Sequence, residues 1–187
     1  MAQSNHNIIT HGLSGKVGDM LVFSQRNGKT IVSTPPRHTK EPTEKQKAHA
    51  QLFQQAVIYA KAAIKSLETK AAYEAAAEKG VNAYNIAVAD MLHAPDIEEI
   101  NLAGYTGKPG DIITIKATDD FKVLAVMVEI HNADGSMVES GNASLRTNGL
   151  EWVYEATVNN PDLHGDRIVV KATDMPANLA EKEELIP

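Results

Sequence analysis

The pattern of apolar and polar positions begins with a β-hairpin. Strands are expected at 17–24 and 30–33, on either side of Asn27-Gly28. Asn-Gly is typical of a two-residue hairpin turn because both residues tolerate positive φ. Apolar residues fall on both faces of the run MLVF, whereas a solvated hairpin should have one polar face. We therefore expect this hairpin to pack against a further partner.

A spacing of three to four residues between apolar positions then predicts helices over about 43–94. Thr43 and Gln46 have the spacing of a capping box at the start of a long helix. Apolar residues from Leu52 to Leu67 would form its buried face. Shorter helices are expected over about 70–79, stopped by Gly80, and from about residue 82 until Pro95. These segments predict a small helical unit.

From residue 97 the pattern changes to alternation, with strands expected at 113–117, 124–130, 152–158 and 168–172. About seven short strands separated by turn signals are typical of an immunoglobulin-like sandwich. The sequence therefore predicts an α+β protein: a β-hairpin plus helical module over 1–95, followed by an Ig-like antiparallel β-sandwich domain over 96–187. The expected sandwich core comprises Ile115, Val126, Val128, Trp152, Tyr154 and Val170.

Four segments resemble a known group of proteins: GKVGDMLVFSQRNGKTIVS, TEKQKAHAQLFQQAVIYAKAA, AYNIAVADML and YTGKPGDIITIKATDDFKV. Together they resemble a family of uncharacterised bacterial proteins that join a hairpin-plus-helix N-terminal segment to an Ig-like C-terminal module. The resemblance covers nearly the whole chain. It implies the same architecture and transfers no catalytic motif or site residue.

Composition removes several classes of function. The 187 residues contain no cysteine, which excludes a disulfide scaffold, a thiolate metal site and a cysteine nucleophile. An aromatic content of 5% disfavours a stacking surface for bases or sugars. No apolar run is long enough for a membrane span, and no signal peptide is visible. The protein is expected in the cytoplasm, or exported by a signal-independent route.

The charge is polarised along the chain. Residues 1–50 have a net charge of +4, whereas residues 101–187 have a net charge of −7. Such a chain can attract copies of itself head to tail. Charge that serves only solubility and happens to be clustered would give the same distribution along the chain. Nucleic-acid binding is disfavoured, because the acidic half would repel a polyanion and no docking motif is present.

Motifs for catalysis are weak. The run from Gly12 to Gly18 fails the spacing of a phosphate loop, and no serine lies in a nucleophile elbow. The seven histidines show no metal-ligand spacing. Calcium has more support, because Asp119, Asp120 and Asp174 follow expected strands at one end of a sandwich. Such carboxylates also form turns by bonding to their own backbone.

These patterns predict a non-enzymatic structural or interaction protein that self-associates into a larger assembly, such as a filament, a surface array or a phage-like particle. No catalytic residue and no cofactor is expected, and partners would be further copies or other protein subunits. The alternative is a monomeric binding module that holds a ligand, a glycan or a calcium ion at the sandwich loops. The residues expected to mediate self-association are Met20, Leu21, Val22, Phe23, Ile31, Val32, Arg37, Lys40, Lys45 and Lys47.

Overall fold

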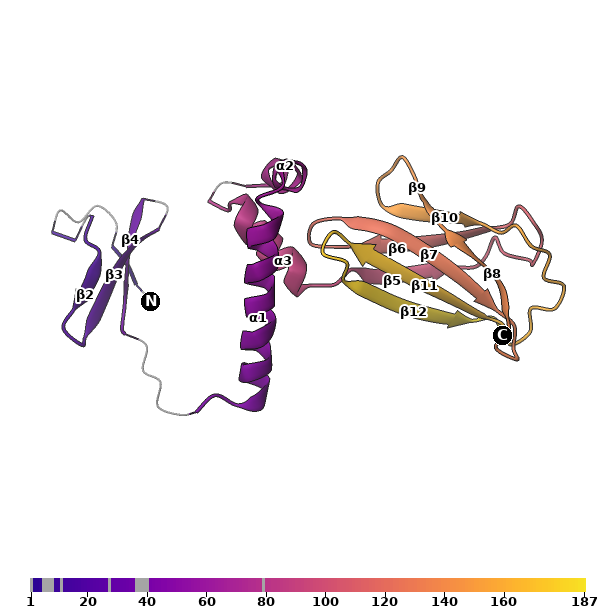
Figure 1. Ribbon diagram of the computed structural model, residues 1–187, viewed down its shortest axis with the longest axis horizontal. Helices are drawn as coiled ribbons and strands as arrows, with labels where there is room; N and C mark the ends of the chain where they lie inside the picture. The colour runs from indigo at the N-terminus through magenta and orange to yellow at the C-terminus, as the bar shows by residue number, and fades with distance from the viewer. Residues whose placement is uncertain (1, 5–8, 11, 27, 36–40, 79) are drawn as a thin grey trace. The chain divides into compact units, whose positions relative to one another are not determined.

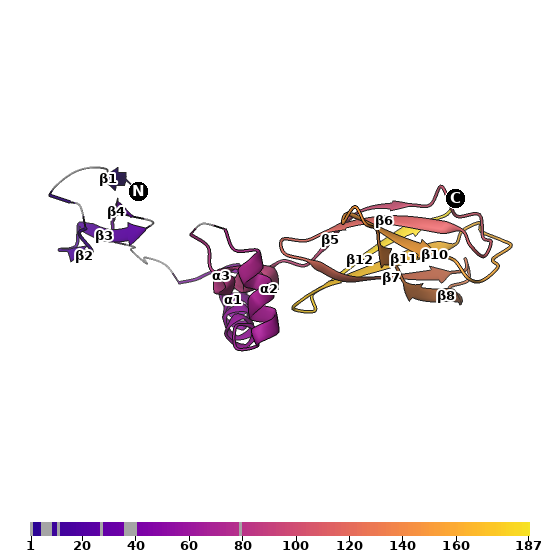
Figure 2. The same ribbon diagram turned by 90° about the horizontal axis from the view of Figure 1, so that it is seen from above.

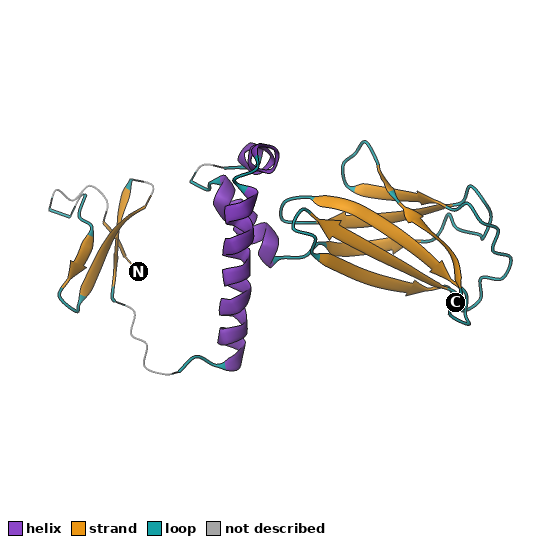
Figure 3. Ribbon diagram, in the orientation of Figure 1, coloured by secondary structure: helices purple, strands orange, loops and turns teal. Residues whose placement is uncertain are grey.

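The protein has an α+β fold, as the sequence predicts (Figure 1, Figure 3). The structure, a computed structural model, describes residues 2–4, 9–10, 12–26, 28–35, 41–78 and 80–187. The chain forms two compact units, Met1–His49 and Ala50–Pro187. The boundary expected at 95/96, which rests on the change of pattern, falls inside the second unit. The expected division into domains stays a prediction.

The N-terminal unit is a four-stranded antiparallel sheet of β1 (Ala2–Ser4), β2 (Gly15–Val17), β3 (Leu21–Arg26) and β4 (Lys29–Ser33), in the order β1-β4-β3-β2. Arg26 pairs with Lys29, which leaves the expected two-residue turn, although Asn27 lies outside the described residues. The prediction of a single strand over 17–24 is wrong. Gly18 has a φ of 55°, and the chain reverses there between β2 and β3.

The helices are α1 (Glu44–Ala63), α2 (Leu67–Ala75) and α3 (Ala83–Leu92). The capping box at α1 is confirmed: the backbone amide of Gln46 donates to Thr43 Oγ1 at 3.3 Å, and that of Thr43 donates to Gln46 Oε1 at 2.8 Å. No helix in the described parts of the chain is long and apolar enough to cross a membrane.

The buried face of α1 is shorter and smaller than expected. It consists of Ala56, Ala60 and Ala63, because the helix ends there. Leu67, expected on this face, instead begins α2 and is 86% exposed. Leu52 is also exposed, since the first half of α1 covers no core among the described residues. Alanines at the contact let the helices approach closely.

The helices pack against one end of the sandwich within the second unit. Tyr73 of α2 is fully buried in a cluster with alanines of α1 and α3. Phe121 and Met175, from two turns of the sandwich, pack against the same cluster. The rings of Tyr73 and Phe121 have centroids 4.5 Å apart. This packing places α3 beside the loops that carry the expected calcium ligands.

The sandwich contains β5 (Asp96–Asn101), β6 (Ile112–Thr118), β7 (Val123–His131), β8 (Met137–Asn142), β9 (Ser144–Leu145), β10 (Glu151–Glu155), β11 (Arg167–Asp174) and β12 (Leu179–Leu185). Its two sheets, seen as separate layers in Figure 2, have the orders β5-β6-β10-β9 and β12-β11-β7-β8. This is the immunoglobulin order, with the second sheet extended by β8. The predicted sandwich is confirmed, except that β10 ends at Glu155 and not at 158.

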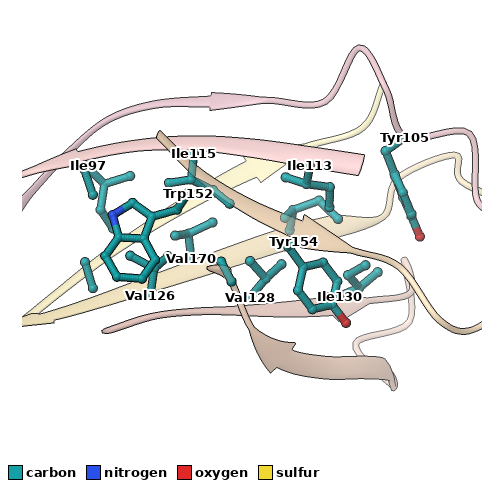
Figure 4. Packing of buried hydrophobic residues seen from close by; sticks show 14 of the residues in the cluster. Ile97, Tyr105, Ile113, Ile115, Val126, Val128, Ile130, Trp152, Tyr154 and Val170 are labelled. Atoms are coloured by element: carbon teal, nitrogen blue, oxygen red, sulfur yellow. The ribbon is translucent and has the colours of Figure 1, made fainter. Parts of the chain in front are cut away.

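Every residue expected in the sandwich core is buried between the two sheets (Figure 4). Ile115 of β6 pairs with Trp152 of β10 in one sheet, and Val128 of β7 pairs with Val170 of β11 in the other. Alternation along each strand directs these side chains inward. The core therefore fixes the positions of the turns at the ends of the sheets.

Candidate functional site

Three carboxylates meet where the helices contact the sandwich. Asp90 lies on α3, Asp119 directly follows β6, and Asp174 is the last residue of β11. One oxygen from each lies within 4.8 Å of the others. Asp90 is 0% exposed and Asp174 is 1% exposed, whereas Asp119 is half-buried. We call these three residues the carboxylate cluster.

Side chains around the carboxylate cluster fix Asp90 and Asp174. The Tyr73 hydroxyl donates to Asp90 Oδ2 at 2.5 Å, and the Tyr59 hydroxyl lies 2.8 Å from that of Tyr73. Asn178, in the turn after β11, donates from its backbone amide to Asp174 Oδ1 at 2.6 Å and from Nδ2 to Asp174 Oδ2 at 2.8 Å. Nδ2 also lies 3.1 Å from the Asp90 carbonyl oxygen, which links α3 to this turn.

Asp119 is held by its own turn. Its Oδ2 accepts hydrogen bonds from the backbone amides of Phe121, at 3.3 Å, and Lys122, at 2.9 Å. This is the turn chemistry that the sequence offered as the alternative to calcium binding. The other oxygen is different: Oδ1 of Asp119 and Oδ1 of Asp90 are both buried and have no hydrogen-bond partner among the described residues.

The electrostatics of the carboxylate cluster are unfavourable for three free anions. Burial raises the pKa of Asp90 to about 7, and the Tyr73 hydrogen bond opposes this rise. The charges of Asp119 and Asp174 add to the rise, as does the nearby Asp119 carboxyl, with which a protonated Asp90 can share its proton. Burial also raises the pKa of Asp174. Within the described parts of the chain, no Lys, Arg or His side chain forms an ion pair with any of the three. A shared proton or a bound cation would relieve this repulsion.

The structure brings together two of the three calcium candidates and separates the third. Asp119 and Asp174 are in the carboxylate cluster, whereas Asp120 is exposed and lies with Oδ2 2.5 Å from His93 Nδ1. Sequence reasoning missed Asp90. Its signal was a carboxylate on the same side of α3 as Ala83 and Ala87, in an otherwise apolar run.

The residues expected to mediate self-association divide between the two faces of the N-terminal sheet. Strand pairing places Val17 beside Leu21 and Phe23 beside Val32 on one face, which we call the apolar face. The opposite face carries Val22, Ile31, Lys16, Ser24, Arg26 and Lys29. The expectation of apolar residues on both faces is therefore confirmed, although they are concentrated on one.

The remaining residues of that set lie outside the sheet. Met20, expected on a strand, is in the turn before β3 and is 74% exposed. Lys45 and Lys47 are exposed in the first turns of α1, where Lys47 pairs with Glu44 at 2.8 Å. Arg37 and Lys40 lie outside the described residues.

The N-terminal sheet has no hydrophobic core of its own in the part that the structure describes. Thr30 is buried there, but every buried hydrophobic side chain belongs to the second unit. On the apolar face, Val17 is 55% exposed and Leu21 is 39% exposed. Within the described residues of the N-terminal unit, Val17 and Leu21 are therefore uncovered, whereas Phe23 and Val32 on the same face are half-buried.

Comparisons with known proteins add little. No protein-family model matches the chain, and no curated protein matches it. Among solved structures, the chain is similar to the crystal structure of CopC from Methylosinus trichosporium OB3b, at 10% identity and a TM-score of 0.37. The match covers 49% of this chain and 88% of that chain. A likeness this weak does not indicate what this chain binds, and the family resemblance seen in the sequence stays a prediction.

Proposed function

We propose that the protein is a non-enzymatic interaction protein whose N-terminal sheet binds another copy of the chain. The observation that carries this proposal is that the N-terminal sheet has an apolar face, while the described residues of its unit include no buried hydrophobic side chain. A small sheet needs a packed hydrophobic face to be stable in water. Val17 and Leu21 are exposed within the described residues of the N-terminal unit, so burial by a partner would supply the missing core.

Charge favours a second copy as that partner. Arg26 and Lys29 lie on the other face of the sheet, within a segment of net charge +4. The last 87 residues, 101–187, have a net charge of −7, and β12 at an edge of the sandwich exposes Glu181, Glu183 and Glu184. Opposite charges at the two ends steer one copy toward another. A head-to-tail contact of this kind generates rings or filaments.

The non-enzymatic part of the proposal is supported by the sequence. It contains no nucleophile elbow, no phosphate loop of the required spacing and no histidine pair with metal-ligand spacing. On the apolar face, Val17, Leu21, Phe23 and Val32 offer contact area to a partner. The chemistry of this face is that of a protein-binding surface.

Two adjacent residues on β3 give a matched test. Phe23 lies on the apolar face and Ser24 lies on the opposite face, so Phe23→Lys and Ser24→Lys add the same charge to different sides. Sedimentation over a hundredfold range of concentration should show association of the wild-type chain. We expect Phe23→Lys to weaken it at least tenfold and Ser24→Lys to leave it nearly unchanged. A wild-type chain that is monomeric throughout, or equal effects of the two variants, would refute the proposal.

A charge test is independent of the apolar face. Reversing Lys45 and Lys47, together with Arg37 and Lys40, to Glu should weaken association at low salt, where screening is least. Added salt should have the same effect on the wild-type chain. An unfolding midpoint unchanged by the reversal would show that the loss comes from the contact and not from the fold. Association that is insensitive to both changes would contradict electrostatic attraction between copies.

A further inference from the structure

We infer that Asp90, Asp119 and Asp174 together bind one calcium ion, which fastens the helices to the end of the sandwich. The inference concerns the second unit alone and is independent of the proposed self-association. It rests on the spacing of the oxygens, on their missing partners and on the residues that orient them.

The spacing suits calcium. Calcium–oxygen distances are about 2.3–2.6 Å, so two oxygens on opposite sides of one ion lie at most about 4.6–5.2 Å apart. The three ligand oxygens lie within 4.8 Å of one another. A single calcium ion can therefore reach all three oxygens.

Two buried carboxylate oxygens in the carboxylate cluster lack a hydrogen-bond partner among the described residues. Asp90 is fully buried, yet its Oδ1 has no hydrogen-bond partner in the described residues, and the same holds for Oδ1 of Asp119. A buried carboxylate oxygen without a partner is costly, and buried charges in proteins are paired or coordinate metals. One cation between Asp90 and Asp119 would satisfy both atoms. Asp174 would supply a third carboxylate and further compensation of charge.

Turn formation explains two members of the carboxylate cluster but not the third. Asp119 and Asp174 bond to backbone amides of their own turns, as aspartates in turns commonly do. Asp90 belongs to helix α3 and has no such role. Tyr73 nevertheless holds Oδ2 of Asp90, its Oδ1 has no hydrogen-bond partner among the described residues, and one of its oxygens lies within 4.8 Å of oxygens of both turn aspartates. A carboxylate placed in this way has the position of a ligand.

The surroundings provide what a metal site needs beyond its ligands. Tyr73 and Asn178 hold Asp90 and Asp174 by hydrogen bonds, as outer residues do around bound metals. A carboxylate has about four acceptor positions, so these bonds leave room for an ion. Asp119 is half-buried and lines a pocket of about 300 Å³ beside Phe121 and Trp152.

Calcium binding can be measured on the full chain after treatment with a chelator. Titration calorimetry should give one site per chain, with Kd of about 10⁻⁶ to 10⁻⁴ M, and calcium should raise the unfolding midpoint. We expect Asp90→Asn and Asp174→Asn to weaken binding at least tenfold. Asp120→Asn is the matched control, because it removes a neighbouring carboxylate that lies outside the carboxylate cluster, and it should leave the affinity unchanged.

Terbium luminescence gives a second measurement that needs no variant. Terbium takes calcium sites, and the nearby Tyr73 should sensitise its emission; calcium should displace terbium from the site. Absence of saturable binding would overturn the inference, as would equal losses in Asp90→Asn and Asp120→Asn. A midpoint insensitive to calcium but raised by Asp90→Asn would also overturn it, because the carboxylate cluster would then hold a shared proton in place of an ion.

Discussion

The hydroxyl of Tyr73 on α2 donates a hydrogen bond to Oδ2 of Asp90 on α3, across 2.5 Å and with both side chains fully buried. This bond ties the two short helices together at the point where they meet the sandwich. The second oxygen of Asp90, Oδ1, is buried and has no hydrogen-bond partner among the described residues. One contact therefore links the packing of the helices to the candidate site.

Removing this hydroxyl tests its contribution to stability. Tyr73→Phe keeps the ring and its packing on Phe121, so the loss should reflect the hydrogen bond alone, about 1–3 kcal/mol in the free energy of unfolding. Tyr59→Phe is the control, because the Tyr59 hydroxyl contacts that of Tyr73 and is only partly buried. It should cost less. Urea denaturation would give the free energy of unfolding of both variants. Equal losses would contradict a larger contribution from the Tyr73 hydroxyl than from that of Tyr59.

The sandwich was predictable because its signals are local. Alternation of apolar and polar residues along β6, β7 and β11 predicted each strand and the face that points into the core. Ile115, Val128 and Val170 lie on these faces, and all three are buried. The capping box at Thr43 is equally local. By contrast, Gly18 bent a run that alternation alone would continue as one strand. A single flexible residue overrode the pattern.

The carboxylate cluster could be predicted only in part, because it is assembled over long distances in the sequence. Asp119 and Asp174 were found since both follow strands that end at the same side of the sandwich. Asp90 is joined to them through Asn178, 88 positions away along the chain. No spacing rule places helix α3 on these particular turns, since its contact depends on Phe121 and Met175 packing against Tyr73.

Trp152 should dominate the stability of the sandwich. It is buried in the core between the sheets, so Trp152→Ala should cost about 3–5 kcal/mol. As the only tryptophan, it should also give a blue-shifted emission in the folded state. Leu179→Ala, at an exposed position of β12, should change stability by less than about 0.5 kcal/mol. A solvent-like emission maximum would contradict the burial of Trp152.

Substitutions at two glycines allow the stability cost of a steric clash to be measured apart from the cost of backbone strain. Gly107 and Gly110 have similar φ values, 84° and 91°. A Cβ at Gly107 would lie 2.1 Å from the carbonyl oxygen of Asn160, whereas a Cβ at Gly110 would meet nothing within 4 Å. Gly110→Ala should therefore cost only the left-handed strain, about 1–2 kcal/mol. Gly107→Ala should cost clearly more, and similar thermal midpoints for the two variants would refute the clash.

Acid should weaken the cross-strand pair of Glu129 and Lys171. Lys171 Nζ lies 2.6 Å from Glu129 Oε1, and this hydrogen bond lowers the pKa of Glu129. A depressed carboxyl pKa stabilises the fold above the unfolded value, near 4.3, and the contribution is lost as the pH falls through the folded value. Lys171→Met should therefore be destabilised at pH 7 and should lose less stability than the wild type between about pH 5 and 3.

The exposed pair of Lys116 and Glu98 is the control for that pH dependence. The same kind of hydrogen bond lowers the pKa of Glu98, but both side chains are more than a third exposed. Solvent screens such a pair, so Lys116→Met should alter the pH profile less. Denaturant midpoints measured across the acid range would show the difference. Identical profiles for the two variants would mean that burial of Glu129 adds nothing to its pair.

Removing the N-terminal sheet should separate folding from association. Residues 1–36 include all of β1 to β4, whereas both clusters of buried hydrophobic residues lie in the unit Ala50–Pro187. The chain that begins at residue 37 should therefore fold, with the tryptophan emission and the cooperative unfolding of the full protein. It should also stay monomeric in light scattering at concentrations where the full chain associates. If it assembles as before, the contact between copies lies on the helices or the sandwich, and the apolar face of the sheet is not what holds them together.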